Sequence, residues 1–236
     1  RAIRAGDLVI LDEGDKLAQL YLKAGDVLQN RYGSFRHDEL IGRPFGHKAV
    51  SSNGKGFVHV LAPTPELWSL SLSHRTQILY AADISTIIAR LDIVPGSTVI
   101  EAGTGSGSLS TSLVTTVAPS GHLYTFEFNE QRCEYAACEF AANGFGANLV
   151  TCTHGDVCEP GWSFSPVVPG LVDVCIFDLP SPWLAVEKAA AVLRPGGRFC
   201  SFSPCVEQIE KTAAELASQR FTGTRVFEVL LRAHEV

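Results

Sequence analysis

The chain has 236 residues, of which 46% are hydrophobic, and a formal net charge of −6. This length allows one or two domains with a sizeable core, and no apolar run is long enough to predict a membrane-spanning helix. The charge is uneven, because residues 1–65 carry +2 and residues 66–236 carry −8. Affinity for nucleic acid comes mainly from Lys and Arg that neutralise phosphates, so the acidic part is not expected to bind nucleic acid strongly by itself.

Short apolar runs separated by turn signals predict that residues 1–63 form a small all-β domain, shaped as a barrel or a curled sheet. We place a domain boundary near residue 63. Thr64-Pro65-Glu66 has the N-cap residue, the proline and the acid of a helix start. The expected strands cover residues 7–11, 17–22, 27–31 and 56–61.

From residue 64 to residue 236 the pattern alternates between strands and helices. Such alternation, with near-continuous apolar strands, predicts a parallel sheet covered on both faces, which is a Rossmann-like α/β fold. A first helix contains Ile84 and Leu91. The expected strands are 99–101, 122–128, 149–153, 171–177, 198–202 and a final one at 224–231, with helices at 107–118, 129–142, 184–193 and 206–219.

A glycine turn follows the first strand of this domain. Glu101 ends the strand, and Gly103, Gly105 and Gly107 follow at alternate positions. Glycine is suited to such a turn because it reaches positive φ and lets backbone approach a ligand closely. A dinucleotide fingerprint would need a glycine where Ser108 stands. The form E-x-G-x-G-x-G is used instead by S-adenosylmethionine-dependent methyltransferases; a strand-to-helix turn without a ligand is the alternative.

Acidic residues follow the next two strands. Glu127 lies twenty residues beyond Gly107, where an acid is expected to bind ribose hydroxyls. Arg132 is expected either to orient that end of the cofactor or to pair with Glu127. Asp156 follows the third strand and is expected to accept a hydrogen bond from an adenine amino group, with Val157 against the ring. An Asx turn is the alternative for Asp156.

The fourth strand ends in Asp178-Leu-Pro-Ser-Pro-Trp183. The two prolines fix their own φ and restrict the residues before them, so the loop is expected to be rigid. Amino-methyltransferases place an acid and an aromatic residue at this loop to hold a base beside the methyl donor; a cap for the following helix is the alternative. We expect Asp178 to be the catalytic residue. The expected substrate contacts are Pro180, Pro182, Trp183, His74 and Arg75.

Other chemistries find less support. The seven cysteines are odd in number and contain no C-x-x-C pair, so buried free thiols are expected rather than disulfides or zinc ligands. This fits a reducing compartment such as the cytosol or the nucleus. The histidines lack ligand spacing, and no metal site is predicted. Neither a G-x-S-x-G elbow nor a P-loop is present.

Six stretches together resemble one protein family and spread across essentially the whole chain. They are Leu40–Gly46, Pro63–Trp68, His74–Tyr80, Glu101–Ser108, Asp178–Trp183 and Arg198–Pro204. The chain is similar in these stretches to the catalytic subunit of the eukaryotic tRNA (adenine(58)-N1)-methyltransferase.

The resemblance implies a class I methyltransferase domain over residues 64–236, S-adenosylmethionine as methyl donor with S-adenosylhomocysteine as product, and N1 of adenine 58 in tRNA as the target. It further implies a non-catalytic sister subunit, a heterotetramer of two pairs and a nuclear location. Alternatives are a methyltransferase acting on another RNA adenine or a protein, and a non-enzymatic RNA-binding partner subunit. Carried over by position, the cofactor contacts are Gln77, Leu79, Glu101, Gly103, Gly105, Ser106, Gly107, Ser108, Glu127, Arg132, Asp156, Val157 and Asp178.

Overall fold

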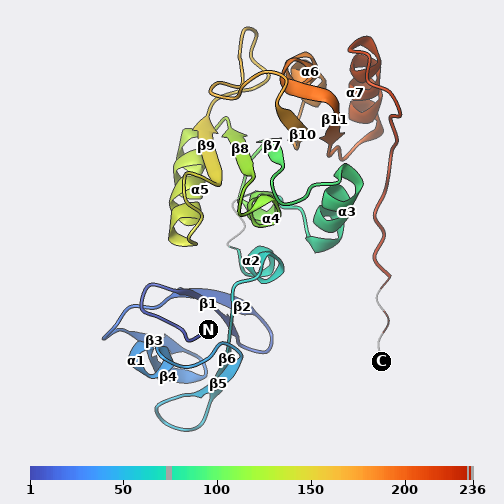
Figure 1. Cartoon of the computed structure of the whole chain (residues 1–236). Coiled ribbons are helices and arrows are strands. Elements are labelled where there is room, and N and C mark those ends of the chain that lie inside the picture. The colour runs from blue at the N-terminus through green and yellow to red at the C-terminus, as the bar shows by residue number, and fades with distance from the viewer. Residues whose placement is uncertain (73–75, 233, 235–236) are drawn as a thin grey trace. The chain divides into compact units, whose positions relative to one another are not determined.

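The computed structural model describes residues 1–72, 76–232 and 234. The chain divides into two compact units, residues 1–74 and residues 75–236 (Figure 1). No helix within the described ranges is long and apolar enough to cross a membrane.

The first unit is built from antiparallel strands, which confirms the expected all-β character. Its larger sheet has the order β2-β1-β6-β5, and β3 pairs with β4 in a separate hairpin. The sheet buries Val9, Leu11, Val58 and Val60 against Phe35 of the hairpin. The sequence analysis missed β4, β5 and a single helical turn, α1, each of which is four residues long. The elements are β1 (Leu8–Asp12), β2 (Leu17–Tyr21), β3 (Val27–Asn30), β4 (Gly33–Arg36), α1 (His37–Leu40), β5 (His47–Val50) and β6 (Phe57–Leu61).

Helix α2 (Pro65–Ser71) packs on the first unit. It begins as the sequence predicts, because Thr64 Oγ1 accepts a hydrogen bond from the backbone N–H of Leu67 at 3.2 Å. Trp68 is buried against Leu8 and Ile10 of β1. The contacts of α2 are therefore with the first sheet, although the predicted second domain starts at residue 64.

The second unit contains a five-stranded parallel sheet with the order β11-β10-β7-β8-β9, which confirms the Rossmann-like prediction. Apolar side chains of α3, α4 and α5 form one core cluster with the sheet, and those of α6 form the other. The elements are α3 (Ala81–Leu91), β7 (Thr98–Ala102), α4 (Ser108–Val117), β8 (His122–Glu127), α5 (Glu130–Ala142), β9 (Val150–His154), β10 (Val172–Phe177), the 3-10 turn η1 (Pro182–Ala185), α6 (Val186–Val192), β11 (Leu193–Ser201) and α7 (Val206–Ser218).

The strand order reverses at β7. From there the chain proceeds to β8 and β9 on one side of the sheet, and to β10 and β11 on the other side. In open α/β sheets, ligands bind at the carboxyl ends of the strands where the order reverses. Gly103 directly follows β7 and Asp178 directly follows β10, so the two predicted site segments meet at this point.

The predicted final strand at residues 224–231 is wrong. These residues form no strand, and the side chains of Leu230 and Leu231 are 80% and 83% exposed. Alternating apolar residues indicate a strand, but a strand also needs its backbone N–H and C=O groups to pair with a neighbouring strand. Residues 224–231 do not pair with the outer edge of β11, which bonds to β10 alone among the described strands. The segment runs away from the sheet as an extended trace (Figure 1), and Phe227 contacts Arg90 of α3.

Candidate active site

The glycine turn adopts a backbone that other residues rarely reach. Gly103, Gly105 and Gly107 have φ values of +96°, +57° and +77°. A Cβ atom at Gly103 would collide with the carbonyl oxygen of Asp178, and one at Gly105 would lie 3.0 Å from Thr76 Oγ1. The turn therefore needs glycine both for its conformation and for close approach of neighbouring backbone.

Glu127 ends β8 and faces the glycine turn. Its side chain is only 3% exposed, and its Oε2 accepts a hydrogen bond from the backbone N–H of Gly105 at 2.9 Å. Its Oε1 accepts from Arg132 Nη2 at 2.7 Å and from the backbone N–H of Asn129 at 3.1 Å. The carboxylate is thus fixed between the turn and the start of α5, and Arg132 makes the ion pair considered from the sequence.

Glu101 lies beneath the turn, on the α4 side of the sheet. It is 1% exposed, and its Oε2 accepts hydrogen bonds from Ser110 Oγ at 2.5 Å and Thr125 Oγ1 at 2.7 Å. Burial raises the pKa of Glu101 to about 7 against the lowering effect of these two hydroxyls, and the charges of Asp178 and Glu127 raise it further. In this structure Glu101 supports the turn from within the core.

The segment before α3 lies against the turn. The backbone N–H of Thr76 donates to Ser106 Oγ at 3.2 Å, and the two hydroxyls are 2.9 Å apart. Ser108 Oγ donates to the carbonyl of Leu79 at 2.7 Å, whereas Gln77 is exposed. The predicted serines and Leu79 are therefore brought together, and Thr76 is a contact that the sequence analysis missed. His74 and Arg75 lie outside the described residues.

Asp156 and Val157 form a tight turn after β9. Asp156 Oδ1 accepts a hydrogen bond from the backbone N–H of Cys158 at 2.8 Å, which is the Asx turn that the sequence left open. The Asp156 side chain is nevertheless exposed, and Val157 is buried at 2% exposure. One carboxylate oxygen shapes the turn, so the other one is available to a ligand.

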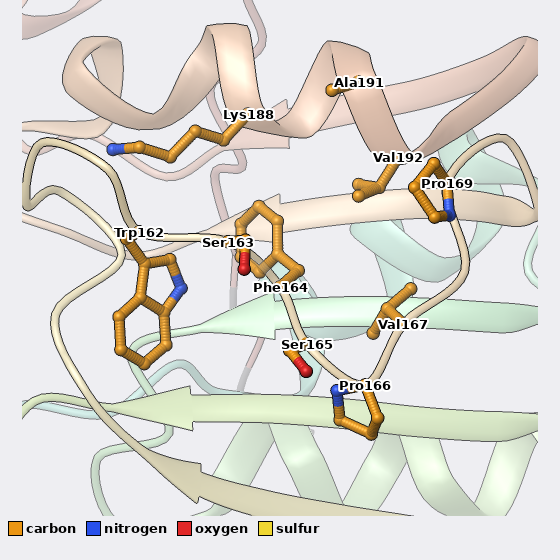
Figure 2. A pocket seen from close by; sticks show the side chains of 10 residues that line it. All are labelled: Trp162, Ser163, Phe164, Ser165, Pro166, Val167, Pro169, Lys188, Ala191 and Val192. Atoms are coloured by element: carbon orange, nitrogen blue, oxygen red, sulfur yellow. The ribbon is translucent and has the colours of Figure 1, made fainter.

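Two residues that the sequence did not single out support this turn from behind. Figure 2 shows Trp162 and Lys188 beside a cavity of about 350 Å³ between residues 162–169 and α6. The Trp162 ring covers Gly155 so closely that a Cβ there would overlap it, and Lys188 Nζ donates to the Val157 carbonyl at 2.8 Å. None of the predicted site residues lines the cavity, which lies behind the turn.

The loop after β10 is the second half of the site. The backbone N–H of Asp178 donates to the Ala102 carbonyl at 2.9 Å, which ties the loop to the end of β7. Burial raises the pKa of the Asp178 carboxyl above its usual value. The missing side chain of Gly103 makes room for the backbone carbonyl of Asp178, so the loop brings this partly buried residue directly beside the glycine turn.

Helix α7 contacts the rest of this loop. Gln208 Nε2 donates to the Pro180 carbonyl at 2.9 Å, and Lys211 Nζ lies 4.8 Å from the centre of the Trp183 ring. Pro182 is buried and begins η1, against which α7 packs. Neither Gln208 nor Lys211 was predicted, because helical periodicity identifies the face of a helix but not the loop that it meets.

The fold and the site together define the class of Rossmann-like S-adenosylmethionine-dependent methyltransferases. The defining features are the strand order, the glycine turn after β7 and the acids at the ends of β8, β9 and β10. A structure of an S-adenosylmethionine-dependent O-methyltransferase from Thermotoga maritima is 27% identical, with a TM-score of 0.86 over 99% of this chain and 85% of that one. The tRNA (m1A58) methyltransferase TrmI from Aquifex aeolicus is 26% identical, with a TM-score of 0.72 over 92% of this chain and 83% of that one.

The particular family follows from sequence models. Residues 56–236 match the family described as the tRNA methyltransferase complex GCD14 subunit, and residues 2–47 match a TrmI-like N-terminal domain. A Dictyostelium discoideum protein named as the catalytic subunit of a tRNA (adenine(58)-N(1))-methyltransferase is 45% identical over the whole of this chain. This chain belongs to the GCD14 subunit family, as the sequence resemblance predicts. It spans 75% of the Dictyostelium protein and 54% of relatives from Cryptococcus neoformans.

Proposed function

We propose that this chain is the catalytic subunit of a tRNA methyltransferase that transfers a methyl group from S-adenosylmethionine to N1 of adenine 58. The observation that carries the proposal is the meeting of the glycine turn with the Asp178 loop. Gly103 and Asp178 are in van der Waals proximity at the point where the strand order reverses. The family and its relatives' names support the choice of substrate.

The residues present suit the cofactor. The glycine turn is a cradle that side chains would fill, and Glu127 is held rigidly over it. Oε2 of this carboxylate can accept a hydrogen bond from a ribose hydroxyl, since it accepts one bond from Gly105, whereas Oε1 already accepts from Asn129 and twice from Arg132. Asp156 and Val157 supply an acceptor and an apolar wall for an adenine ring. Ser106 to Ser108 would surround the amino-acid end.

Methyl transfer to N1 of adenine needs little general acid or base catalysis from the protein. S-adenosylmethionine supplies an electrophilic methyl group when it is bound. N1 of adenine carries an available lone pair, so no side chain has to remove a proton before methylation. Positioning and electrostatic stabilisation are then the main contributions of the chain. We assign to Asp178 the acceptance of a hydrogen bond from the exocyclic amino group and the stabilisation of the positive charge that develops on the base.

The rigid loop and its aromatic residue suit a base that has left its stack. Enzymes that modify a base extrude it into a pocket and stack it on aromatic or apolar side chains. Trp183 supplies such a ring, and Pro180 and Pro182 restrict the backbone between it and Asp178. These three residues form the wall that would contact the target adenine.

The charge distribution favours a partner for RNA binding. The −8 charge of residues 66–236 opposes association with phosphates. A sister subunit with positive surface is therefore part of the proposal, in a heterotetramer of two pairs located in the nucleus. The names of the relatives, which describe a catalytic subunit, support the existence of a second subunit.

Calorimetry tests the cofactor half of the proposal directly. Titration with S-adenosylmethionine should give one saturable site per chain, and Glu127→Ala should weaken this binding strongly. A subunit that keeps the fold but has lost catalysis would show no binding. A chain that binds S-adenosylmethionine but methylates no tRNA when paired with its partner would instead be a methyltransferase with another target.

A further inference from the structure

Helix α7 makes a side-chain hydrogen bond to the loop that carries the predicted catalytic residue. Gln208 Nε2 donates to the Pro180 carbonyl at 2.9 Å, two residues beyond Asp178. Lys211 lies one helical turn further and places its ammonium over the Trp183 ring. Residues three apart on a helix share a face, so the first two turns of α7 meet the loop at two points.

The loop has few other means of fixing itself. Pro180 and Pro182 lack a backbone N–H and cannot donate hydrogen bonds. At the ends of the loop, the Asp178 N–H donates to Ala102 and the Leu184 N–H donates to the Ser181 carbonyl at 3.1 Å; the Cys158 thiol donates to the same Ser181 carbonyl at 3.5 Å, which is a weak hydrogen bond. Between these ends, the Pro180 carbonyl depends on a side chain from another element.

The Gln208 side chain has one polar atom that does not contribute to stability. Its Oε1 is buried and makes no hydrogen bond within the described part of the chain. A buried polar atom without a partner is unfavourable, and such atoms in native structures call for a functional explanation. Methionine has nearly the same length and shape without the amide, so Gln208→Met removes this unpartnered oxygen together with the hydrogen bond to Pro180 and keeps the volume of the side chain.

We propose that Gln208 is a positioning residue for methyl transfer, which fixes the Pro180 carbonyl and thereby sets the place of Asp178 beside the target base. Gln208 itself touches neither substrate nor cofactor in this assignment. The inference rests on the proposed function, because it deepens the role of the same site. Its consequence is that the rate depends on α7, an element that carries none of the predicted site residues.

The test compares Gln208→Met and Gln208→Glu with wild type, using the full chain co-purified with its partner subunit. Neither methionine nor an ionised glutamate can donate to the Pro180 carbonyl. Both variants should lose about tenfold to a hundredfold in kcat, which is the scale expected when a catalytic group is misplaced by about 1 Å. KM for S-adenosylmethionine should stay within about twofold, and Gln208→Met should not lower the melting temperature.

A matched control lies at the other end of the same helix. Gln219 Nε2 donates to Glu215 Oε1 at 2.9 Å, far along α7 from the loop. Gln219→Met also removes an amide donor from this helix, and it should leave kcat unchanged. A loss of rate in Gln219→Met equal to that in Gln208→Met would show that any weakening of α7 reduces activity, and the specific role of Gln208 would be wrong.

Hydrogen exchange gives a readout that does not depend on activity. The peptide covering residues 178–185 should exchange faster in Gln208→Met than in wild type, and no faster in Gln219→Met. Unchanged exchange in this peptide, or an unchanged kcat in Gln208→Glu, would overturn the inference. If wild type methylates no tRNA, the proposed function fails, and the exchange measurement still decides whether Gln208 fixes the loop.

Discussion

The Glu127 carboxylate accepts a hydrogen bond from the backbone N–H of Gly105 at 2.9 Å. The acid that ends the second strand of the domain is thus joined to the glycine turn that follows the first. Arg132 binds the other oxygen of the same carboxylate at 2.7 Å. The position of the Glu127 carboxylate, which we propose binds the cofactor, and the shape of the glycine turn are therefore coupled, and a change at either residue alters both.

Glu127→Ala should weaken binding of S-adenosylmethionine by at least about a hundredfold, because it removes the ribose acceptor and also the anchors of Gly105 and Arg132. Removal of a hydrogen bond to a charged group costs about 1.5–3 kcal/mol, and more than one is lost here. Calorimetric titration measures the change. Glu134→Ala, at an exposed position on α5, is the control and should bind normally; equal binding by both variants would contradict the assignment.

Gly103→Ala should lower both stability and activity. The residue has φ +96°, and a Cβ there would collide with the Asp178 carbonyl oxygen, so the loop after β10 must move. Gly25→Ala is a matched control, since Gly25 has φ +79° with open space around it. Both changes carry the cost of a left-handed alanine, about 1–2 kcal/mol. Only Gly103→Ala should also reduce kcat, which steady-state methylation assays would show.

Asp178→Asn should reduce kcat by about a hundredfold or more, the scale of lost electrostatic stabilisation at an active site, while cofactor affinity is retained. Burial raises the pKa of Asp178, and the ionised carboxylate is the form that stabilises a positive base. The rate of wild type should therefore fall as the pH is lowered through this raised pKa. Asp178→Asn should lack that acidic limb. If Asp178→Asn had the same pH profile as wild type, the acidic limb would belong to a group other than Asp178.

Glu101→Gln should change how stability depends on pH. The pKa of Glu101 is about 7 in the folded chain and 4.5 for the unperturbed group. The folded state therefore binds the proton more tightly, and the contribution of Glu101 is complete below pH 4.5 and lost as the pH rises towards 7. The loss is roughly 3 kcal/mol over this interval. Urea unfolding at pH 5 and pH 8 should show a smaller difference between the two pH values in Glu101→Gln than in wild type.

The sequence predicted the parallel sheet and most of its bounds, because buried strands and glycine punctuation are local signals. The turn at Gly103, the acid at Glu127 and the loop at Asp178 were found for the same reason. Thr76, Lys188 and Gln208 were not predicted. Each acts through a contact with a distant segment, and neither composition nor periodicity indicates which backbone group a polar side chain will meet.

The wrong prediction at residues 224–231 has a related cause. Alternating apolar residues describe what a strand needs from its environment but not whether the segment will pair with a neighbouring strand. Glu101 shows a further limit. Its place before the glycines identifies the motif, yet only the structure shows the carboxyl turned towards Ser110 and Thr125 in the core.

Mapping the methylated nucleotide on tRNA tests the central proposal most directly. The full chain, co-purified with its partner subunit, is incubated with unmodified tRNA and S-adenosylmethionine, and the product is digested and analysed by mass spectrometry. The account predicts one N1-methyladenosine, at position 58, which forms about a hundredfold more slowly or worse with Asp178→Asn under the same conditions. Methylation at another position or atom, or none in a complex that binds both cofactor and tRNA, would contradict it.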